Sequence, residues 1–90
     1  MLSPLLALPD AQRLIATRIR SARRRQQLTQ AQLAERAQVG VATIHRLERD
    51  GTGQVTTLLR VLSALGHLRD VEGLLQQPEP QSLDELRARQ

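Results

Sequence analysis

The sequence predicts an all-α fold in which short helices share one aliphatic core. Apolar residues recur every three or four positions, and no stretch alternates between apolar and polar residues as a half-buried strand would. The chain has no Phe, Tyr or Trp, so the core has to be made of Leu, Ile, Val and Ala. At 90 residues the chain holds one domain at most, with a thin core. A second subunit often adds buried area to so small a domain, and we therefore expect a homodimer.

The first predicted helix begins at Asp10, which is expected to act as its N-cap, and ends near Gln27. Its apolar spacing predicts a buried stripe made of Leu14, Ile15, Ile19 and Ala22. The other side of this helix is expected to face solvent and to carry Arg18, Arg20, Arg24 and Arg25. The arginines at positions 23–25 do not form a single patch, since successive helix residues point in different directions.

The remaining helices follow from caps and breakers. Thr29 is a good N-cap for a helix over residues 30–37, and the turn over residues 38–40 leads into a helix over residues 41–49. A loop over residues 50–53 precedes a helix over residues 55–65, which Gly66 ends, and a short helix over residues 68–75. Residues 76–81 form a polar linker with two prolines. A capping box from Ser82 to Glu85 predicts a last helical turn or two over residues 83–89.

Composition excludes several function classes. The net charge is +4 and all 13 basic residues are arginine, which suits an acidic polymer as partner; codon bias would give the same arginine usage. Residues 1–60 carry a formal charge of +6, and residues 61–90 carry a formal charge of −2. The absence of aromatic side chains on which bases could stack argues against single-stranded nucleic acid as the partner class. With no cysteine and two isolated histidines, His45 and His67, we expect no metal site.

No targeting or catalytic pattern is present. The apolar opening of the chain lacks a basic region and a cleavage pattern, and no apolar run is long enough to span a membrane, so we expect a cytoplasmic protein. No nucleophile stands with a base, and no pair of carboxylates has an apolar setting. The segment 51–53 lacks the strand, lysine and helix of a phosphate-binding loop. We expect neither enzymatic activity nor a cofactor.

Residues 30–49 carry the most information. Leu33, Ala37, Val39, Ile44 and Leu47 are spaced so that two short helices can cross at a wide angle over one core, and the small Ala34 allows a close approach. The second helix would then project Val41, Ala42, His45, Arg46 and Arg49 outward. An exposed helix face of this width fits the major groove of B-DNA, where base edges can be read.

The segments L-T-Q-x-x-L-A-E-R-A (residues 28–37) and T-I-H-R-L-E-R (residues 43–49) resemble the Xre/Cro family of helix-turn-helix repressors, and the match extends over residues 14–65. The resemblance implies a compact five-helix, lambda-repressor-like DNA-binding domain over residues 10–76. An N-terminal extension (1–9) and a proline-containing linker with a short helix (77–90) would flank it. Two positions depart from the family pattern: Gln38 stands where a turn glycine is usual, and Gly40 stands where a polar cap is usual. Gln38 would have to adopt a left-handed backbone.

The resemblance assigns Gln30 to a phosphate or base contact, although an ordinary exposed first-turn residue would look the same. Arg46 is the best candidate for a guanine contact, with a phosphate contact as the competing interpretation. Val41 and Ala42 suit thymine methyl groups, or are plain helix surface, and His45 contacts DNA or is solvated. The further DNA-binding candidates are Thr43, Arg49, Thr52, Gly53 and Gln54, of which the last four flank the loop that lies along the DNA backbone in the family. Arg24 and Arg25 contact phosphate or form a solvated face.

The resemblance gives Arg23 a structural role. It matches a family arginine that pairs with a glutamate at the position of Glu48, and such a pair would tie the first helix to the reading helix.

The C-terminal side resembles HipB-type antitoxin repressors. Residues 57–75 are rich in leucine, and Pro-Glu-Pro and Ser-Leu-Asp-Glu-Leu follow. Such proteins bind an operator as dimers and also hold a kinase-fold toxin. We therefore expect a dimeric, autoregulatory repressor on a palindromic operator, and the alternative is an antitoxin whose main role is to neutralise such a toxin. The apolar residues left for a partner are Leu62, Leu65, Leu68, Val71, Leu74 and Leu75.

Overall fold

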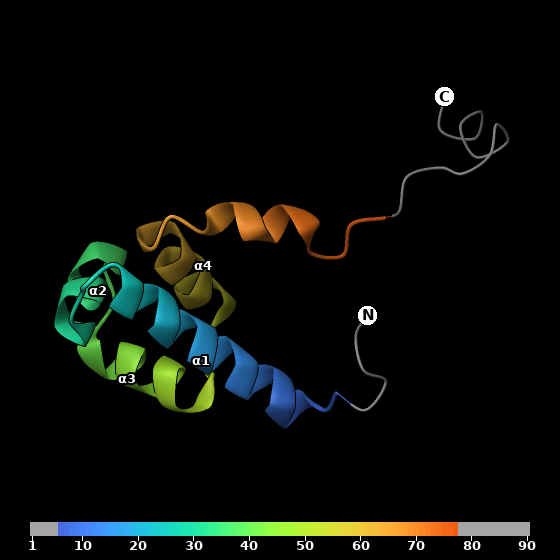
Figure 1. Ribbon diagram of the computed structural model, residues 1–90, viewed down its shortest axis with the longest axis horizontal. Coiled ribbons are helices and arrows are strands. Elements are labelled where there is room, and N and C mark those ends of the chain that lie inside the picture. Colours follow the sequence, from blue (N-terminus) through green and yellow to red (C-terminus); the bar gives the residue numbers. More distant parts are fainter. Residues whose placement is uncertain (1–5, 78–90) are drawn as a thin grey trace, which may run out of the picture.

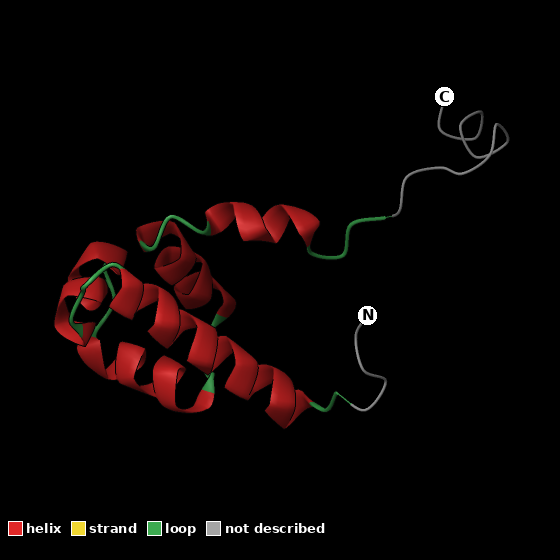
Figure 2. Ribbon diagram, viewed as in Figure 1, coloured by secondary structure: helices red, strands yellow, loops and turns green. Residues whose placement is uncertain are grey.

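The computed structural model describes residues 6–77 as a small bundle of helices (Figure 1). The elements are α1 (Leu8–Arg25), α2 (Gln30–Ala37), α3 (Val41–Asp50), α4 (Val55–Ala64) and a 3₁₀ helix, η1 (Leu68–Gly73). Figure 2 shows helices and loops and no strand in this part of the chain, which confirms the predicted all-α fold. The predicted linker and the helix over residues 83–89 lie outside the described residues, as does most of the apolar opening of the chain.

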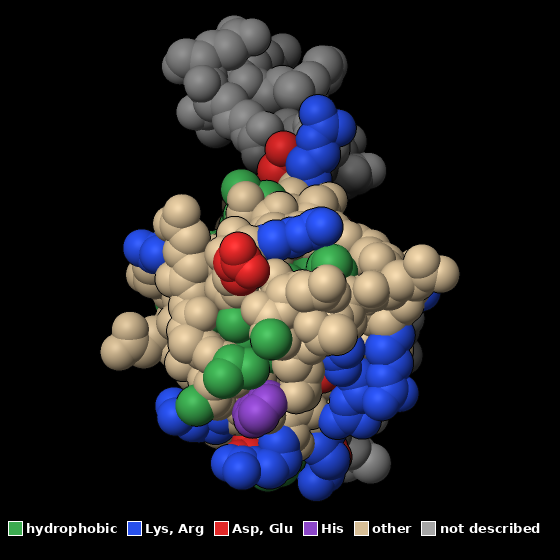
Figure 3. Space-filling model, turned by 90° about the vertical axis from the view of Figure 1, so that its left-hand side faces the viewer, with side chains coloured by type: hydrophobic (Ala, Val, Ile, Leu, Met, Phe, Trp, Pro, Cys, Tyr) green, Lys and Arg blue, Asp and Glu red, His purple; other side chains and the backbone are tan. Residues whose placement is uncertain are grey.

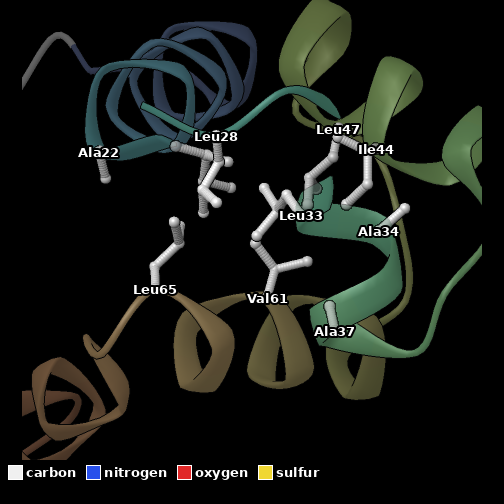
Figure 4. Close-up of a cluster of buried hydrophobic side chains, with 10 residues drawn as sticks. Ala22, Leu28, Leu33, Ala34, Ala37, Ile44, Leu47, Val61 and Leu65 are labelled. Atoms are coloured by element: carbon white, nitrogen blue, oxygen red, sulfur yellow. The ribbon is translucent and has the colours of Figure 1, made fainter. Parts of the chain in front are cut away.

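The core lies where α1, α2, α3 and α4 meet (Figure 4). Leu33 of α2, Ile44 of α3 and Val61 of α4 are completely buried. The remaining buried members of this cluster are Ile19, Ala22, Leu28, Ala34, Ala37, Leu47 and Leu65. The predicted shared core of the 30–37 and 41–49 helices is therefore confirmed, with Val39 packed partly against it.

The prediction that Asp10 caps α1 is wrong. The N-cap lies three residues earlier, at Ala7, and the helix begins at Leu8. Pro9 lies in the first turn, where a backbone N–H has no helical acceptor, so the missing N–H of proline costs no hydrogen bond. Asp10 occupies the third helical position, and its Oδ2 accepts a hydrogen bond of 3.0 Å from the Ala7 N–H. This contact is the first cause that lowers the pKa of Asp10, followed by the hydrogen bond from Arg13.

The predicted end and buried stripe of α1 also need correction. The helix ends at Arg25 because Gln27 adopts a left-handed backbone (φ 58°), after which the Leu28 N–H donates to the Arg23 carbonyl at 3.2 Å. Leu14 is 42% exposed, whereas Ile19 and Ala22 are buried as predicted.

The helix pair α2–α3 follows its local signals. Thr29 caps α2 as predicted: its side chain accepts from the Gln32 N–H at 3.0 Å, and Gln32 Oε1 accepts from the Thr29 N–H at 2.8 Å. Gln38 has the predicted left-handed backbone (φ 59°), and Gly40 precedes α3 without any side-chain cap. The turn therefore forms without the residues that usually favour it, at a cost of about 1 kcal/mol for Gln38.

Gly51 joins the end of α3 to α1. Its backbone is left-handed (φ 69°), and a Cβ placed there would lie 2.1 Å from the Gln12 carbonyl oxygen. Only glycine fits this position, because both the conformation and the close approach exclude a side chain. The loop thus begins at Gly51 and not at Asp50, which is the last residue of α3.

The C-terminal elements differ from the prediction in two details. Gly66 ends the helix as expected (φ 77°), but the segment after it is a 3₁₀ helix that stops at Gly73, not at Leu75. Leu65, counted among the residues left for a partner, belongs to the core. None of the helices within residues 6–77 is long and apolar enough to cross a membrane.

Candidate nucleic-acid interface

Helix α3 presents two different faces. Its inner face carries Ile44, Leu47 and Glu48, all buried against α1 and α2. Its outer face carries the side chains expected there, all exposed: Val41, Ala42, His45, Arg46 and Arg49. Thr43 lies between the two faces and is half-buried. The outer face therefore offers apolar groups at its N-terminal end and cationic groups farther along.

An ion pair fastens α3 to α1 from the inside. Arg23 Nε lies 2.6 Å from Glu48 Oε2, and Arg23 Nη2 donates to Glu48 Oε1 at 2.8 Å. The third arm of the guanidinium, Nη1, donates to the Leu28 carbonyl at 2.8 Å. Arg23 is 9% exposed and Glu48 is 2% exposed. The side chain that the resemblance assigns a structural role thus has its donors occupied within the protein.

The ionisation of Glu48 depends on this pairing. Burial raises the pKa of Glu48, but hydrogen bonds from Arg23 and Gln30, together with the charges of Arg23 and Arg20, outweigh burial and leave the pKa below its usual value. The hydrogen bond to Glu48 raises the pKa of Arg23. Both groups are therefore charged at neutral pH, and the pair contributes to stability only while Glu48 is ionised.

Arg20 forms a second connection between α1 and α3. Its Nη2 donates to the Glu48 carbonyl oxygen at 2.6 Å, one of the carbonyls at the C-terminal end of α3 that lack a helical N–H partner. The prediction that Arg20 points away from the bundle is wrong, because the last turn of α3 packs beside it. Arg20 and Arg23 lie one helical turn apart on α1, but no local sequence signal reveals that α3 crosses there.

Gln30 is partly engaged within the protein. Its Nε2 lies 3.2 Å from Glu48 Oε1, at the first helical position of α2. An amide NH₂ carries two hydrogens, so one remains for an acceptor outside the protein. Glu48 thereby orients the side chain that sequence analysis assigns to a DNA contact, and this orienting contact was not predicted.

Comparison with known families gives one match. A family described as a helix-turn-helix domain matches residues 14–75. The chain belongs to this family. Its α2–turn–α3 unit is the helix-turn-helix, which indicates DNA binding and points to transcription regulation. Neither the curated proteins nor the solved structures yield a match.

A shallow groove lies beside the helix-turn-helix. It has a volume of about 360 Å³ and is lined by Arg20, Gln30, His45, Glu48 and Arg49. Arg49 Nε donates to Asp50 Oδ2 at 3.0 Å, and Arg49 Nη2 lies 2.8 Å from the same oxygen. The hydrogen bond from Arg49 lowers the pKa of Asp50. Since both side chains are exposed, the pair is weak, and Arg49 can leave Asp50 for a phosphate at little cost.

The other candidates lie around the helix-turn-helix. Thr52 is half-buried and Gly53 is exposed in the loop after α3, and Gln54 is the exposed N-cap of α4. Arg24 and Arg25 are exposed at the end of α1. Helix α3 lies at the bottom of the molecule in Figure 1 and so at the bottom of Figure 3. There, hydrophobic side chains and a histidine lie among arginines.

Within residues 6–77 no three His, Cys, Asp or Glu side chains gather closely enough to hold a metal ion.

Proposed function

We propose that this helix-turn-helix protein is a cytoplasmic transcriptional repressor that reads double-stranded DNA with the outer face of α3. The observation that carries the proposal is the division of α3 into a buried, ion-paired inner face and an outer face with no packing partner among the described residues. A helix held on one side and free on the other fits the major groove.

The outer face supplies the base contacts in this proposal. Arg46 donates to the O6 and N7 atoms of a guanine through its planar fork. Val41 and Ala42, at the start of α3, contact thymine methyl groups, while Thr43 and His45 lie at the edges of the contact. Arg46 follows Ala42 by four residues, so both side chains project from the same side of the helix.

The surrounding residues supply phosphate contacts, which fix the register of the protein on DNA without specifying sequence. Gln30 donates its free amide hydrogen, and Arg49 exchanges Asp50 for a phosphate. Thr52 and Gln54 contact the backbone from the loop after α3. Arg23 and Glu48 do not contact DNA in this scheme, since their polar atoms are occupied by each other, by Gln30 and by Leu28.

The protein acts as a dimer on a palindromic operator, with half-sites about one helical turn, roughly 10 bp, apart, and represses its own gene. Selection of bound sequences from random duplex DNA tests this directly. A palindromic consensus is expected, whereas an asymmetric footprint combined with a monomer in sedimentation would contradict the dimer.

Arg46→Ala tests the reading role of α3. We expect a loss of about 1–3 kcal/mol in specific binding and a relaxed preference at one base pair of each half-site. Arg36→Ala is the matched control, because Arg36 is an exposed arginine of α2 outside the outer face of α3. If Arg46→Ala lost the same affinity for every DNA sequence, and the slope of log K against log salt concentration became shallower by about one, Arg46 would be a phosphate ligand.

The alternative function is that of an antitoxin that neutralises a kinase-fold toxin. Leu74 and Leu75, after η1, favour a protein partner because they are 70% and 91% exposed. A kinase-fold toxin that is encoded in the same operon and co-purifies with this protein would support the alternative. An isolated gene would favour the simple regulator.

A further inference from the structure

The segment around η1 has an apolar surface that DNA reading by α3 does not use. Leu59 of α4, with Leu68 and Val71 of η1, lines a groove of about 420 Å³, and Arg69 and Glu72 lie at its edge. Leu68 is exposed, while Leu59 and Val71 are half-buried. An apolar groove that opens to solvent beside exposed leucines is typical of a surface that binds another protein.

The geometry of a 3₁₀ helix arranges this surface in two ridges. With three residues per turn, side chains three positions apart lie one above the other. Leu68 and Val71 therefore form an apolar ridge, and Arg69 and Glu72 form a charged ridge beside it. No ion pair joins Arg69 or Glu72 to another side chain of residues 6–77, so both charges are available to a partner.

One positive and one negative charge on the same short ridge make the surface complementary to itself. Under a two-fold axis an antiparallel copy brings each Arg69 opposite Glu72 of the partner subunit, and the apolar ridges meet between the two ion pairs. DNA is not the favoured occupant, because Arg69 stands beside Asp70 and Glu72 in η1 and the surface is not a basic patch.

We propose that this surface is the dimer interface: η1 of one subunit packs antiparallel against η1 of a second copy, with reciprocal Arg69–Glu72 ion pairs at its two ends. The inference rests on the proposed dimeric state and gives it a location. Because η1 packs against α4 and lies away from α3 (Figure 1), pairing there leaves the outer face of α3 uncovered in both subunits.

A charge exchange tests the interface. Full-length protein is studied by sedimentation velocity over a range of concentrations as wild type, Arg69→Glu, Glu72→Arg and the double variant. Each single change places like charges opposite each other twice per dimer, so we expect association to weaken about tenfold or more. The double variant restores opposite charges across the axis and should associate as the wild type does. Arg36→Glu, with the same charge change on α2, should leave association unchanged.

Binding to a duplex with a single half-site separates this inference from the DNA-binding proposal. The Arg69 and Glu72 variants should keep the half-site affinity of the wild type, since η1 does not contribute to α3. Singles that associate like the wild type, a double variant no better than the singles, or an equal effect of Arg36→Glu would overturn the interface while leaving DNA binding intact. A wild type that stays monomeric throughout would overturn both the interface and the dimer.

Discussion

Removing either member of the Arg23–Glu48 pair should destabilise the protein severely. In Arg23→Ala the Glu48 carboxylate, 2% exposed, keeps only the hydrogen bond of 3.2 Å from Gln30, and the Leu28 carbonyl loses the guanidinium. In Glu48→Ala the Arg23 guanidinium loses two of its three acceptors. An unpaired buried charge costs about 3–5 kcal/mol, a large part of the roughly 5–15 kcal/mol that stabilises a typical domain.

The double-alanine variant should be less destabilised than the sum of the singles, by about 1–3 kcal/mol, because it leaves no unpaired charge. Urea unfolding followed by far-ultraviolet circular dichroism measures all four proteins, since the chain has no Trp or Tyr for fluorescence. Additive effects, or single variants within about 0.5 kcal/mol of wild type as for ordinary surface changes, would refute the role of the pair.

The pH dependence gives an independent check with a definite sign. The folded-state pKa of wild-type Glu48 lies below the usual 4.5, so its contribution is present above about pH 4.5 and is lost as the pH falls through the folded pKa. In Arg23→Ala burial dominates and should raise the pKa of Glu48. Protonation of Glu48 then removes the unpaired buried charge and reduces the loss of stability in this variant. The stability difference between wild type and Arg23→Ala should therefore shrink from pH 7 toward pH 4. Asp10 and Asp50 titrate in both proteins, so their contributions cancel in this difference. A stability difference that does not change with pH would contradict the pairing.

Three further changes test the backbone and the DNA face. In urea unfolding, Gly51→Ala should lower the free energy of unfolding clearly more than Gly66→Ala, because both positions have positive φ but only Gly51 lies against the Gln12 carbonyl. We expect a loss of about 1–2 kcal/mol for Gly66→Ala. Equal losses for the two variants would contradict the close approach. Gln38→Gly should raise the free energy of unfolding by about 0.5–1 kcal/mol, since glycine relieves the left-handed backbone, and a loss of stability would show that the Gln38 side chain matters more. Gln30→Ala should weaken binding to specific and scrambled duplexes by the same factor in fluorescence anisotropy, and an effect confined to the specific duplex would indicate a base contact.

Features specified by neighbouring residues could be predicted from the sequence. Thr29 and Gln32 cap α2 by contacts three residues apart, and Gly66 ends α4 through its own backbone conformation. The buried and exposed faces of α3 follow from its 3.6-residue period, because that helix crosses α2 immediately before it in the chain.

Features specified by distant residues could not be predicted in the same way. The contact from Arg20 to α3 joins residues 28 positions apart, and Gly51 is required by the Gln12 carbonyl of another helix. Leu14 has the correct spacing for burial but is 42% exposed, because spacing alone does not show which part of a helix its neighbours cover. The Arg23–Glu48 pair was anticipated because a family resemblance carries information about three-dimensional contacts that helical periodicity does not.

The polar contacts and the close backbone approach that hold α3 are concentrated at one of its ends. Arg20, Arg23 and Gln12 all reach residues 48–51, through a carbonyl, a carboxylate and a close backbone approach. The opposite end begins at Gly40 without a side-chain cap, where Val41 and Ala42 are exposed. The restrained end therefore sets the direction of the helix, while the completely buried Ile44 holds the first turn through the core. In the proposed complex, the apolar contacts to thymine methyl groups come from this first turn, where a methyl contact needs no hydrogen-bond geometry. The guanine contact of Arg46 comes from the turn closer to the anchor, where a bidentate fork needs a fixed position.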